Sequence, residues 1–132
     1  MKKIALLFIF IAFVSCQQKE NPASETIQQE LIYEVVTADA FADYIQGKDI
    51  QLLDVRTKKE FEGGHIKGAA HHHIYDKDFK EQLRYLDKEK PVYVYCKSGG
   101  RSEEAALELK EMGFKKIYDL KGGISSWKGE VE

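Results

Sequence analysis

The residues best suited to chemistry are the six from Cys96 to Arg101, which read Cys-Lys-Ser-Gly-Gly-Arg. They follow the apolar run Val92-Tyr93-Val94-Tyr95 and precede a segment with helical periodicity that continues to Met112. This order predicts a strand, a glycine-containing loop and a helix. In an open α/β sheet, ligands bind at such junctions, beyond the carboxyl ends of strands and against helix N-termini. A cysteine placed there can act as a nucleophile.

The loop is expected to favour the thiolate form of Cys96, which is the reactive form. The backbone N–H groups after the cysteine, curled by two glycines, can point into one concavity above the helix N-terminus. Two basic side chains add positive charge, and a serine hydroxyl can donate to the same anion. The predicted anion-binding residues are Lys97, Ser98, Gly99, Gly100 and Arg101. The alternative is a buried structural cysteine, which leaves the polar residues after it unexplained.

Two chemistries use a cysteine in such a loop, attack on phosphorus and attack on sulfur. Four residues separate Cys96 from Arg101, whereas the loop of cysteine phosphatases has one more. A shorter loop makes a narrower ring of amides, which fits a single sulfur atom better than a phosphoryl group. The spacing favours sulfur, and hydrolysis of an aryl phosphate remains the alternative to test.

The rest of the chain alternates between strand and helix patterns. Strands are predicted at 31–36, 50–53, 70–74, 92–95 and 116–120, and helical segments at 37–46, 57–61, 76–86 and 101–112. A last turn after Gly122-Gly123 is expected to bury Trp127. Five strands alternating with helices predict an α/β fold in which helices cover both faces of a parallel sheet.

A second charged segment, Asp54-Val55-Arg56, follows the strand at 50–53. Because the carboxyl ends of parallel strands meet at one edge of a sheet, Arg56 is expected near the cysteine loop. It is therefore a candidate for binding an anionic substrate. An ion pair of Arg56 with Asp54 or Glu60 is an equally open alternative.

At this point the sequence resembles the rhodanese family of sulfurtransferases, from about Val35 to Trp127. Three separated motifs carry the resemblance in the family's order. They are Asp54-Val55-Arg56 with Glu60-Phe61 and Gly64-His65-Ile66-Lys67-Gly68-Ala69, then Cys96 to Arg101, and then Leu120-Lys121-Gly122-Gly123 with Trp127. The resemblance implies a single-domain rhodanese-like fold over residues 31–132, with a five-stranded parallel sheet flanked by helices.

The resemblance also implies an enzyme of the thiosulfate sulfurtransferase type. The Cys96 thiolate would take the outer sulfur from a donor anion such as thiosulfate and hold it as a persulfide on the loop amides. Cyanide, a thiol or an acceptor protein would then remove that sulfur. Lys97 and Arg101 would attract the donor, His65 would be structural, and no metal or organic cofactor is implied. The alternative is a rhodanese-like binding or redox-relay module that acts on a partner protein.

The chain departs from the family pattern at His71-His72-His73. On a strand, His71 and His73 would share a face and could offer two nitrogen ligands to a metal. A stable zinc site needs three or four ligands, and no cysteine or carboxylate pair has the spacing to complete one. We therefore expect surface or pocket-lining histidines and no metal site.

The N-terminus has the pattern of an export signal. Lys2 and Lys3 precede an apolar run at 4–14, whose 11 residues are too few for a bilayer that needs about 20. Phe13-Val14-Ser15-Cys16 resembles the lipobox of bacterial lipoproteins, with phenylalanine at the usual leucine position. We expect a signal peptide at 1–15, lipid attachment at Cys16, a flexible tether at 16–30 and location in the bacterial cell envelope. An ordinary signal peptide followed by a chance cysteine is the alternative.

Composition limits the remaining possibilities. The 132 residues suit one domain, and 20 Lys and Arg against 22 Asp and Glu give a net charge of −2. Without a basic excess, nucleic acid is not an expected partner. The two cysteines, Cys16 and Cys96, have such different surroundings that no disulfide is predicted.

Overall fold

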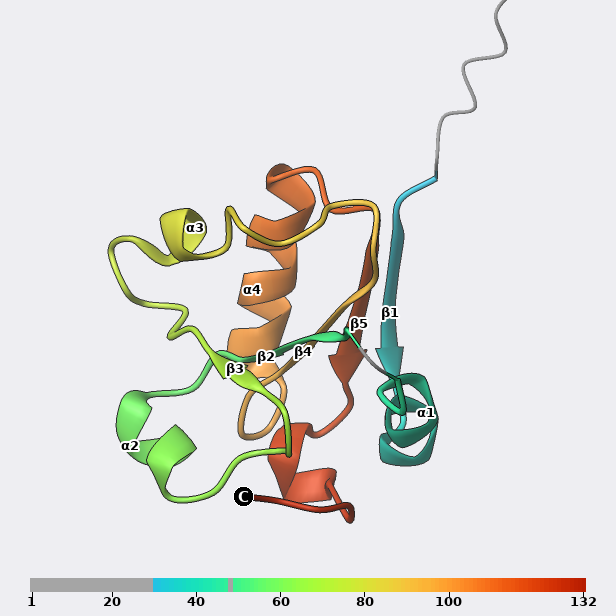
Figure 1. Ribbon diagram of the computed structural model, residues 1–132, viewed down its shortest axis with the longest axis vertical. Coiled ribbons are helices and arrows are strands. Elements are labelled where there is room, and N and C mark those ends of the chain that lie inside the picture. Colours follow the sequence, from blue (N-terminus) through green and yellow to red (C-terminus); the bar gives the residue numbers. More distant parts are fainter. Residues whose placement is uncertain (1–29, 48) are drawn as a thin grey trace, which may run out of the picture.

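The computed structural model describes residues 30–47 and 49–132 (Figure 1). The predicted signal peptide, Cys16 and the predicted tether up to residue 29 lie outside the described residues. In the described part, no helix is long and apolar enough to cross a membrane.

The predicted five-stranded parallel sheet is confirmed. Its strands are β1 (Ile32–Val36), β2 (Gln51–Asp54), β3 (Ala70–His71), β4 (Val92–Tyr95) and β5 (Lys116–Leu120). They lie in the order β1-β5-β4-β2-β3, and every neighbouring pair is parallel. The carboxyl ends of the central strands β5, β4 and β2 therefore meet at one edge, where the cysteine loop begins.

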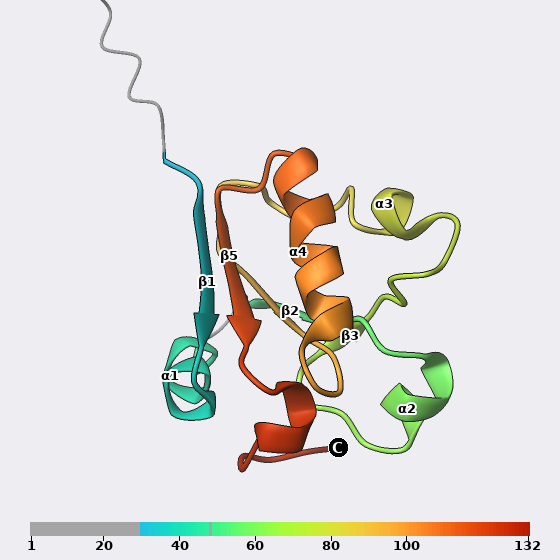
Figure 2. The same ribbon diagram turned by 180° about the vertical axis from the view of Figure 1, so that it is seen from behind.

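Helical segments cover both faces of this sheet (Figures 1 and 2). On one face, α4 (Gly100–Glu111) packs on β4 and β5, and α3 (Phe79–Gln82) contributes Phe79 to the core cluster that also includes Leu83, Leu109, Val92 and Val94. On the other face lie α1 (Ala38–Tyr44) and the 3-10 turn η1 (Gly123–Ser126), where Phe41 and Leu120 are buried. The remaining helix, α2 (Lys58–Glu62), follows β2.

The helices α1 and α2 begin with side-chain caps. The Thr37 hydroxyl accepts from the Ala40 amide at the start of α1. Thr57 and Glu60 form a capping box at the start of α2, each side chain accepting from the other's backbone N–H. Such caps satisfy the first free amides of a helix and fix its starting point.

Three expectations about local structure are wrong. The strand predicted at 70–74 is the two-residue β3, which ends at His71. The helix predicted at 76–86 is the single turn α3, because its N-cap Asp78 makes no capping bond and its carboxylate instead accepts from the Gln82 side chain at 2.9 Å. The side chains expected on the core face, those of Phe79, Leu83 and Leu86, are nevertheless buried. Trp127, predicted to be buried, is partly exposed and meets Phe41 edge to face at 6.2 Å.

Candidate active site

Cys96 lies at the first position after β4 and is 1% exposed. Its sulfur accepts a hydrogen bond of 3.0 Å from the Gly99 amide. Gly99 is the N-cap of α4 and has a φ of 119°, a value that glycine adopts readily and other residues rarely do. This conformation turns the loop back over the sulfur, as the sequence predicts.

The backbone of the loop is also held from the other side by η1. The Ile124 amide donates to the Cys96 carbonyl at 2.9 Å, and the Ser125 amide donates to the Lys97 carbonyl at 3.1 Å. Gly123 packs so closely that an added Cβ would lie 2.4 Å from the Lys97 carbonyl carbon. The glycine pair recognised in the sequence therefore lets η1 approach the cysteine loop.

Two opposing effects set the charge of the thiol. Burial raises the pKa of the Cys96 thiol, whereas hydrogen bonds from the Ser102 hydroxyl and amide and from the amides of Gly99 and Ser98 lower it. The hydrogen bonds outweigh burial, so the pKa of Cys96 is lowered and the thiolate is favoured. Ser98 thus contributes its backbone amide, whereas the sequence suggested its hydroxyl.

Ser102 is a candidate site residue that the sequence analysis missed. It lies in the first turn of α4 and is fully buried, and its hydroxyl donates to the Gly99 carbonyl at 3.0 Å. One signal could have found it, since Ser102 is three and four residues before Ala105 and Ala106, which are buried on the same helix face. A serine on a core-facing stripe needs a polar partner.

Arg101 is paired within the protein. Its guanidinium donates two hydrogen bonds of 2.8 Å to the Glu60 carboxylate on α2. Hydrogen bonding from Arg101 holds the pKa of Glu60 well below its usual range. Arg101 therefore ties the cysteine loop to α2, and its charge is already compensated.

The remaining loop residues lie at or near the surface. Lys97, Ser98 and Gly100 are exposed, and Gly99 is partly exposed. The mouth of the loop is thus formed by backbone, one lysine and one serine. This arrangement can attract and hold a small anion over the sulfur through amide N–H groups.

Arg56 forms the ion pair with Asp54 that the sequence left open. Its guanidinium lies 2.6 Å from Asp54 and donates to the Gly64 carbonyl at 2.8 Å, and the residue is only 6% exposed. Because Asp54 pairs with Tyr95 in the sheet register, Arg56 does lie near the start of the cysteine loop. Its Nε and Nη2 groups, however, donate to the protein's own acceptors.

The histidines are used in local contacts. His71 Nε2 lies 2.8 Å from the Arg56 carbonyl, His72 lies 3.1 Å from Gln82 Oε1 and 3.0 Å from the Tyr85 hydroxyl, and His73 lies 3.3 Å from Asp76. β3 ends at His71, so His71 and His73 do not share a strand. Among residues 30–47 and 49–132, no group of three or more His, Cys, Asp or Glu side chains could hold a metal ion.

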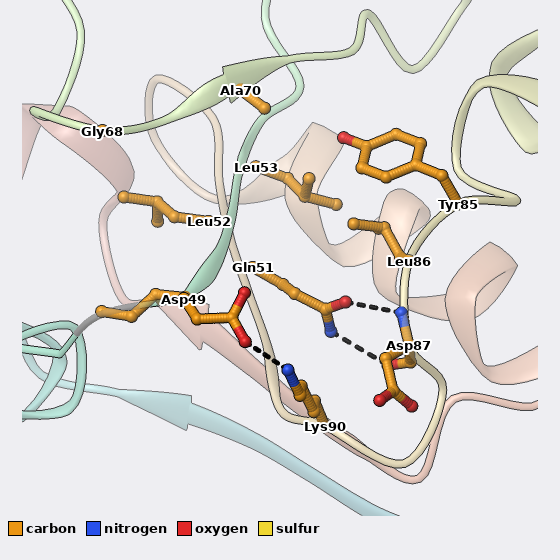
Figure 3. A pocket seen from close by; sticks show the side chains of 11 residues that line it. Asp49, Gln51, Leu52, Leu53, Gly68, Ala70, Tyr85, Leu86, Asp87 and Lys90 are labelled. Atoms are coloured by element: carbon orange, nitrogen blue, oxygen red, sulfur yellow. Dashed lines mark hydrogen bonds and ion pairs between the residues drawn. The ribbon is translucent and has the colours of Figure 1, made fainter.

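A cavity of about 270 Å³ lies at the opposite end of the sheet (Figure 3). Gln51 at the start of β2 spans it, exchanging hydrogen bonds of 3.0 and 2.6 Å with the backbone of Asp87. Lys90 and Asp49 form an ion pair beside it. Gln51 is paired in register with Val92, at the end of β4 away from Cys96, so this cavity is separate from the thiol.

A thiol held by backbone amides at the carboxyl edge of a parallel sheet defines the site as a cysteine anion loop on an α/β domain. The family description "Rhodanese-like domain" matches residues 37–130. The chain therefore belongs to the rhodanese-like domain family.

Individual relatives support this assignment. Protein YqhL of Bacillus subtilis (strain 168) is 36% identical over 133 residues, covering 100% of this chain and 98% of its own length. The thiosulfate sulfurtransferase GlpE of Coxiella burnetii (strain RSA 331 / Henzerling II) is 40% identical over 86 residues, 65% of this chain and 78% of that protein. A crystal structure of a rhodanese-like domain protein from Staphylococcus aureus has a TM-score of 0.65 at 26% identity, covering 75% of this chain and 96% of that chain.

Proposed function

We propose that this protein is a sulfurtransferase that moves a sulfane sulfur from a donor such as thiosulfate to a thiophilic acceptor. The observation that carries the proposal is the buried Cys96 sulfur, which accepts from the Gly99 amide at 3.0 Å inside a four-residue loop. The similarity to a thiosulfate sulfurtransferase supports the same chemistry.

In the first half-reaction, the Cys96 thiolate attacks the outer sulfur of thiosulfate. The new bond joins the two sulfur atoms, and the S–S bond of thiosulfate breaks, so that sulfite leaves with the bonding electron pair. The product is a Cys96 persulfide anion, whose charge the amides of Ser98 and Gly99 can stabilise as they stabilise the thiolate. The exposed ammonium of Lys97 would steer the donor anion toward the loop.

In the second half-reaction, an acceptor attacks the outer sulfur of the persulfide. Cyanide becomes thiocyanate, and a thiolate becomes a persulfide, while the Cys96 thiolate leaves with the electrons of the S–S bond. No net oxidant or reductant is consumed. The first half-reaction and the second therefore return Cys96 to its starting state.

The test is a thiosulfate-to-cyanide assay combined with mass spectrometry of the Cys96 peptide. We expect thiocyanate formation, and we expect that peptide to gain the mass of one sulfur atom when thiosulfate is supplied without acceptor. Cys96→Ser should abolish both, whereas Cys16→Ala should leave both unchanged. The proposal fails if the wild type forms no thiocyanate and Cys96 gains no sulfur from thiosulfate or from other sulfane donors.

A second candidate is a relay module that accepts sulfur or oxidising equivalents from a docked protein. The exposure of Lys97, Ser98 and Gly100 around the buried sulfur favours it, because a partner can contact the loop directly. Cys96→Ser would serve as a trap for such a partner. Robust thiosulfate turnover without any captured partner would remove this candidate, and turnover of an aryl phosphate would instead favour the phosphatase alternative.

We also propose that the domain acts outside the cytoplasm, anchored through lipid at Cys16. The proposal is supported by the basic N-terminus, the apolar run at 4–14 and the lipobox-like sequence ending at Cys16. Mass spectrometry of the protein isolated from membranes should find Cys16 as a lipid-modified first residue. Recovery of an unmodified N-terminus, or of the intact leader, would contradict the proposal.

A further inference from the structure

Asp119 is a buried acidic residue that the proposed reaction leaves without a role. It lies on β5, beside Val94 of β4 in the sheet register, and is 2% exposed. Val94 and Cys96 belong to the same core cluster, which α4 covers, and Ser102 of α4 is near enough to Asp119 to lower the pKa of its carboxyl. Asp119 is therefore placed next to the strand that carries the nucleophile.

The hydrogen bonding of Asp119 is incomplete. Oδ2 accepts from the Tyr33 hydroxyl of β1 at 3.4 Å, a long bond, while Oδ1 is buried with no hydrogen-bond partner among the described residues. A buried polar oxygen without a partner is costly, and in a native protein it needs an explanation.

Ser102 is fully buried in the first turn of α4, the helix that packs on both the strand of Asp119 and the strand that leads to Cys96. Its hydroxyl donates to the Gly99 carbonyl in the geometry shown, but it is also close enough for its hydrogen bonding to lower the pKa of both Cys96 and Asp119. A hydroxyl has one proton to donate and two lone pairs that accept. The Cys96 thiolate and an ionised Asp119 therefore compete for one Ser102 proton.

We propose that Asp119 is a positioning residue for Cys96 that acts through the Ser102 hydroxyl. When Asp119 is protonated, its carboxyl donates to Ser102 Oγ and leaves the Ser102 proton free for the Cys96 thiolate. When Asp119 is ionised, it accepts from Ser102 and draws the hydroxyl away from the sulfur. The buried carboxyl thus controls the reactivity of the thiol.

The charges around Asp119 allow this exchange near neutral pH. Burial raises the pKa of Asp119 to about 6, with Ser102 and Tyr33 lowering it and Glu103 of α4 raising it. Tyr33 has its pKa raised to about 12, so it remains a neutral donor. Lys110 of α4 lies over the Tyr33 ring at 5.4 Å, and on the side of the cysteine loop Arg101 and Tyr75 interact with the charge of Cys96.

The inference rests on Cys96 being the nucleophile of the proposed function, but it can be tested without any sulfur donor. The rate at which a neutral alkylating agent modifies the Cys96 peptide, measured by mass spectrometry from acid to alkaline pH, reports the thiolate fraction. In the wild type, the alkylation rate should rise less steeply with pH than it would for a thiol that titrates alone, because ionisation of Asp119 disfavours the Cys96 thiolate.

Asp119→Asn should change this pH profile in a defined way. The asparagine amide keeps donating to Ser102 at every pH, so the profile should become that of a single group. At pH 7 the alkylation rate should rise roughly three- to tenfold, as expected for one retained hydrogen bond. In a Ser102→Ala background, the same substitution should have no such effect, since the connecting hydroxyl is gone.

The proposal is overturned if the pH profiles of Asp119→Asn and wild type coincide, or if Asp119→Asn has the same effect with and without the Ser102 hydroxyl.

A measurement on the unmutated chain covers the case in which these variants do not fold. The carboxyl carbon of Asp119 is titrated by NMR before and after alkylation of Cys96 with a neutral group. Linkage is reciprocal, so removing the thiolate should lower the pKa of Asp119. An unchanged titration would refute the coupling, and a failure of sulfur transfer alone would leave it standing.

Discussion

The carboxylate of Glu60 accepts hydrogen bonds of 2.8 Å from both terminal nitrogens of the Arg101 guanidinium, joining the cysteine loop to α2. Glu60 also accepts from the amide and the hydroxyl of Thr57, so a single carboxylate caps a helix and fixes the loop. The positive charge of Arg101 is therefore already paired with Glu60 before any donor binds. The pair can hold the loop amides in place, and under the proposed function the exposed Lys97 would attract the donor anion.

Two substitutions of Glu60 separate these roles. Glu60→Gln keeps an oxygen that can accept from the Thr57 amide but loses the charge that pairs with Arg101, and should cost about 1 kcal/mol of unfolding free energy. Glu60→Ala also removes the cap and should cost about 1 kcal/mol more. Both should slow sulfur transfer to a similar extent, because both release Arg101. Urea denaturation and the thiocyanate assay measure the two effects, and unchanged transfer in both variants would show that the pair does not hold the loop.

The same pair has a defined pH dependence. The pKa of Glu60 is lowered on folding, so its stabilisation is present above the unfolded value and is lost as the pH falls through the folded one. The difference in unfolding free energy between wild type and Glu60→Gln should therefore be constant between about pH 6 and 8 and shrink in acid. A difference that grew in acid would contradict this assignment.

Arg56 is predicted to be structural. Arg56→Ala leaves the fully buried Asp54 without its cation and should cost about 3–5 kcal/mol. Asp54→Asn combined with Arg56→Met removes both charges and should restore most of that stability. The KM for thiosulfate of this double variant should match the wild type. A raised KM at near-normal stability would return Arg56 to the donor-binding residues.

The sequence predicted the cysteine loop and the sheet because both depend on local pattern. The apolar run of β4, the two loop glycines and the periodicity of α4 each sit within a few residues of Cys96. The helix at 76–86 was wrong because the Asp78 carboxylate bonds to Gln82 instead of capping, a choice made by contacts that periodicity does not record. Asp119 and Ser102 were missed for a related reason. Each is an ordinary polar residue until the sheet register and α4 bring them together behind the sulfur.

The contact between η1 and the loop gives a prediction about Gly123. An alanine there would meet the Cys96 carbonyl oxygen at 2.5 Å and would have to adopt a φ of 60°. Gly113 is the matched control, because its φ is 92° and an added Cβ would have no atom within 4 Å. Gly113→Ala should cost about 1–2 kcal/mol from the backbone conformation alone and leave sulfur transfer intact. Gly123→Ala should cost about 1–3 kcal/mol more and reduce transfer, because the loop must move. Equal effects of the two alanines would mean that the close approach of η1 does not position Cys96.

Burial of Asp119 should appear in the stability of the whole domain. Its pKa is raised from 3.8 to about 6 on folding, chiefly by burial, so the folded state binds more protons than the unfolded state between these values. The stabilisation is complete below the unfolded pKa and is lost as the pH rises through about 6. Asp119→Asn should therefore gain stability relative to wild type as the pH rises from about 4 to 7, by up to about 3 kcal/mol. Asp43→Asn, at an exposed position on α1, controls for the loss of one negative charge. The measurement is urea denaturation of the three proteins across this range. The difference in unfolding free energy between wild type and Asp119→Asn could instead stay constant with pH. The folded protein would then accommodate the ionised carboxyl of Asp119 as well as the protonated one, and the proposed competition for the Ser102 proton would have no driving force.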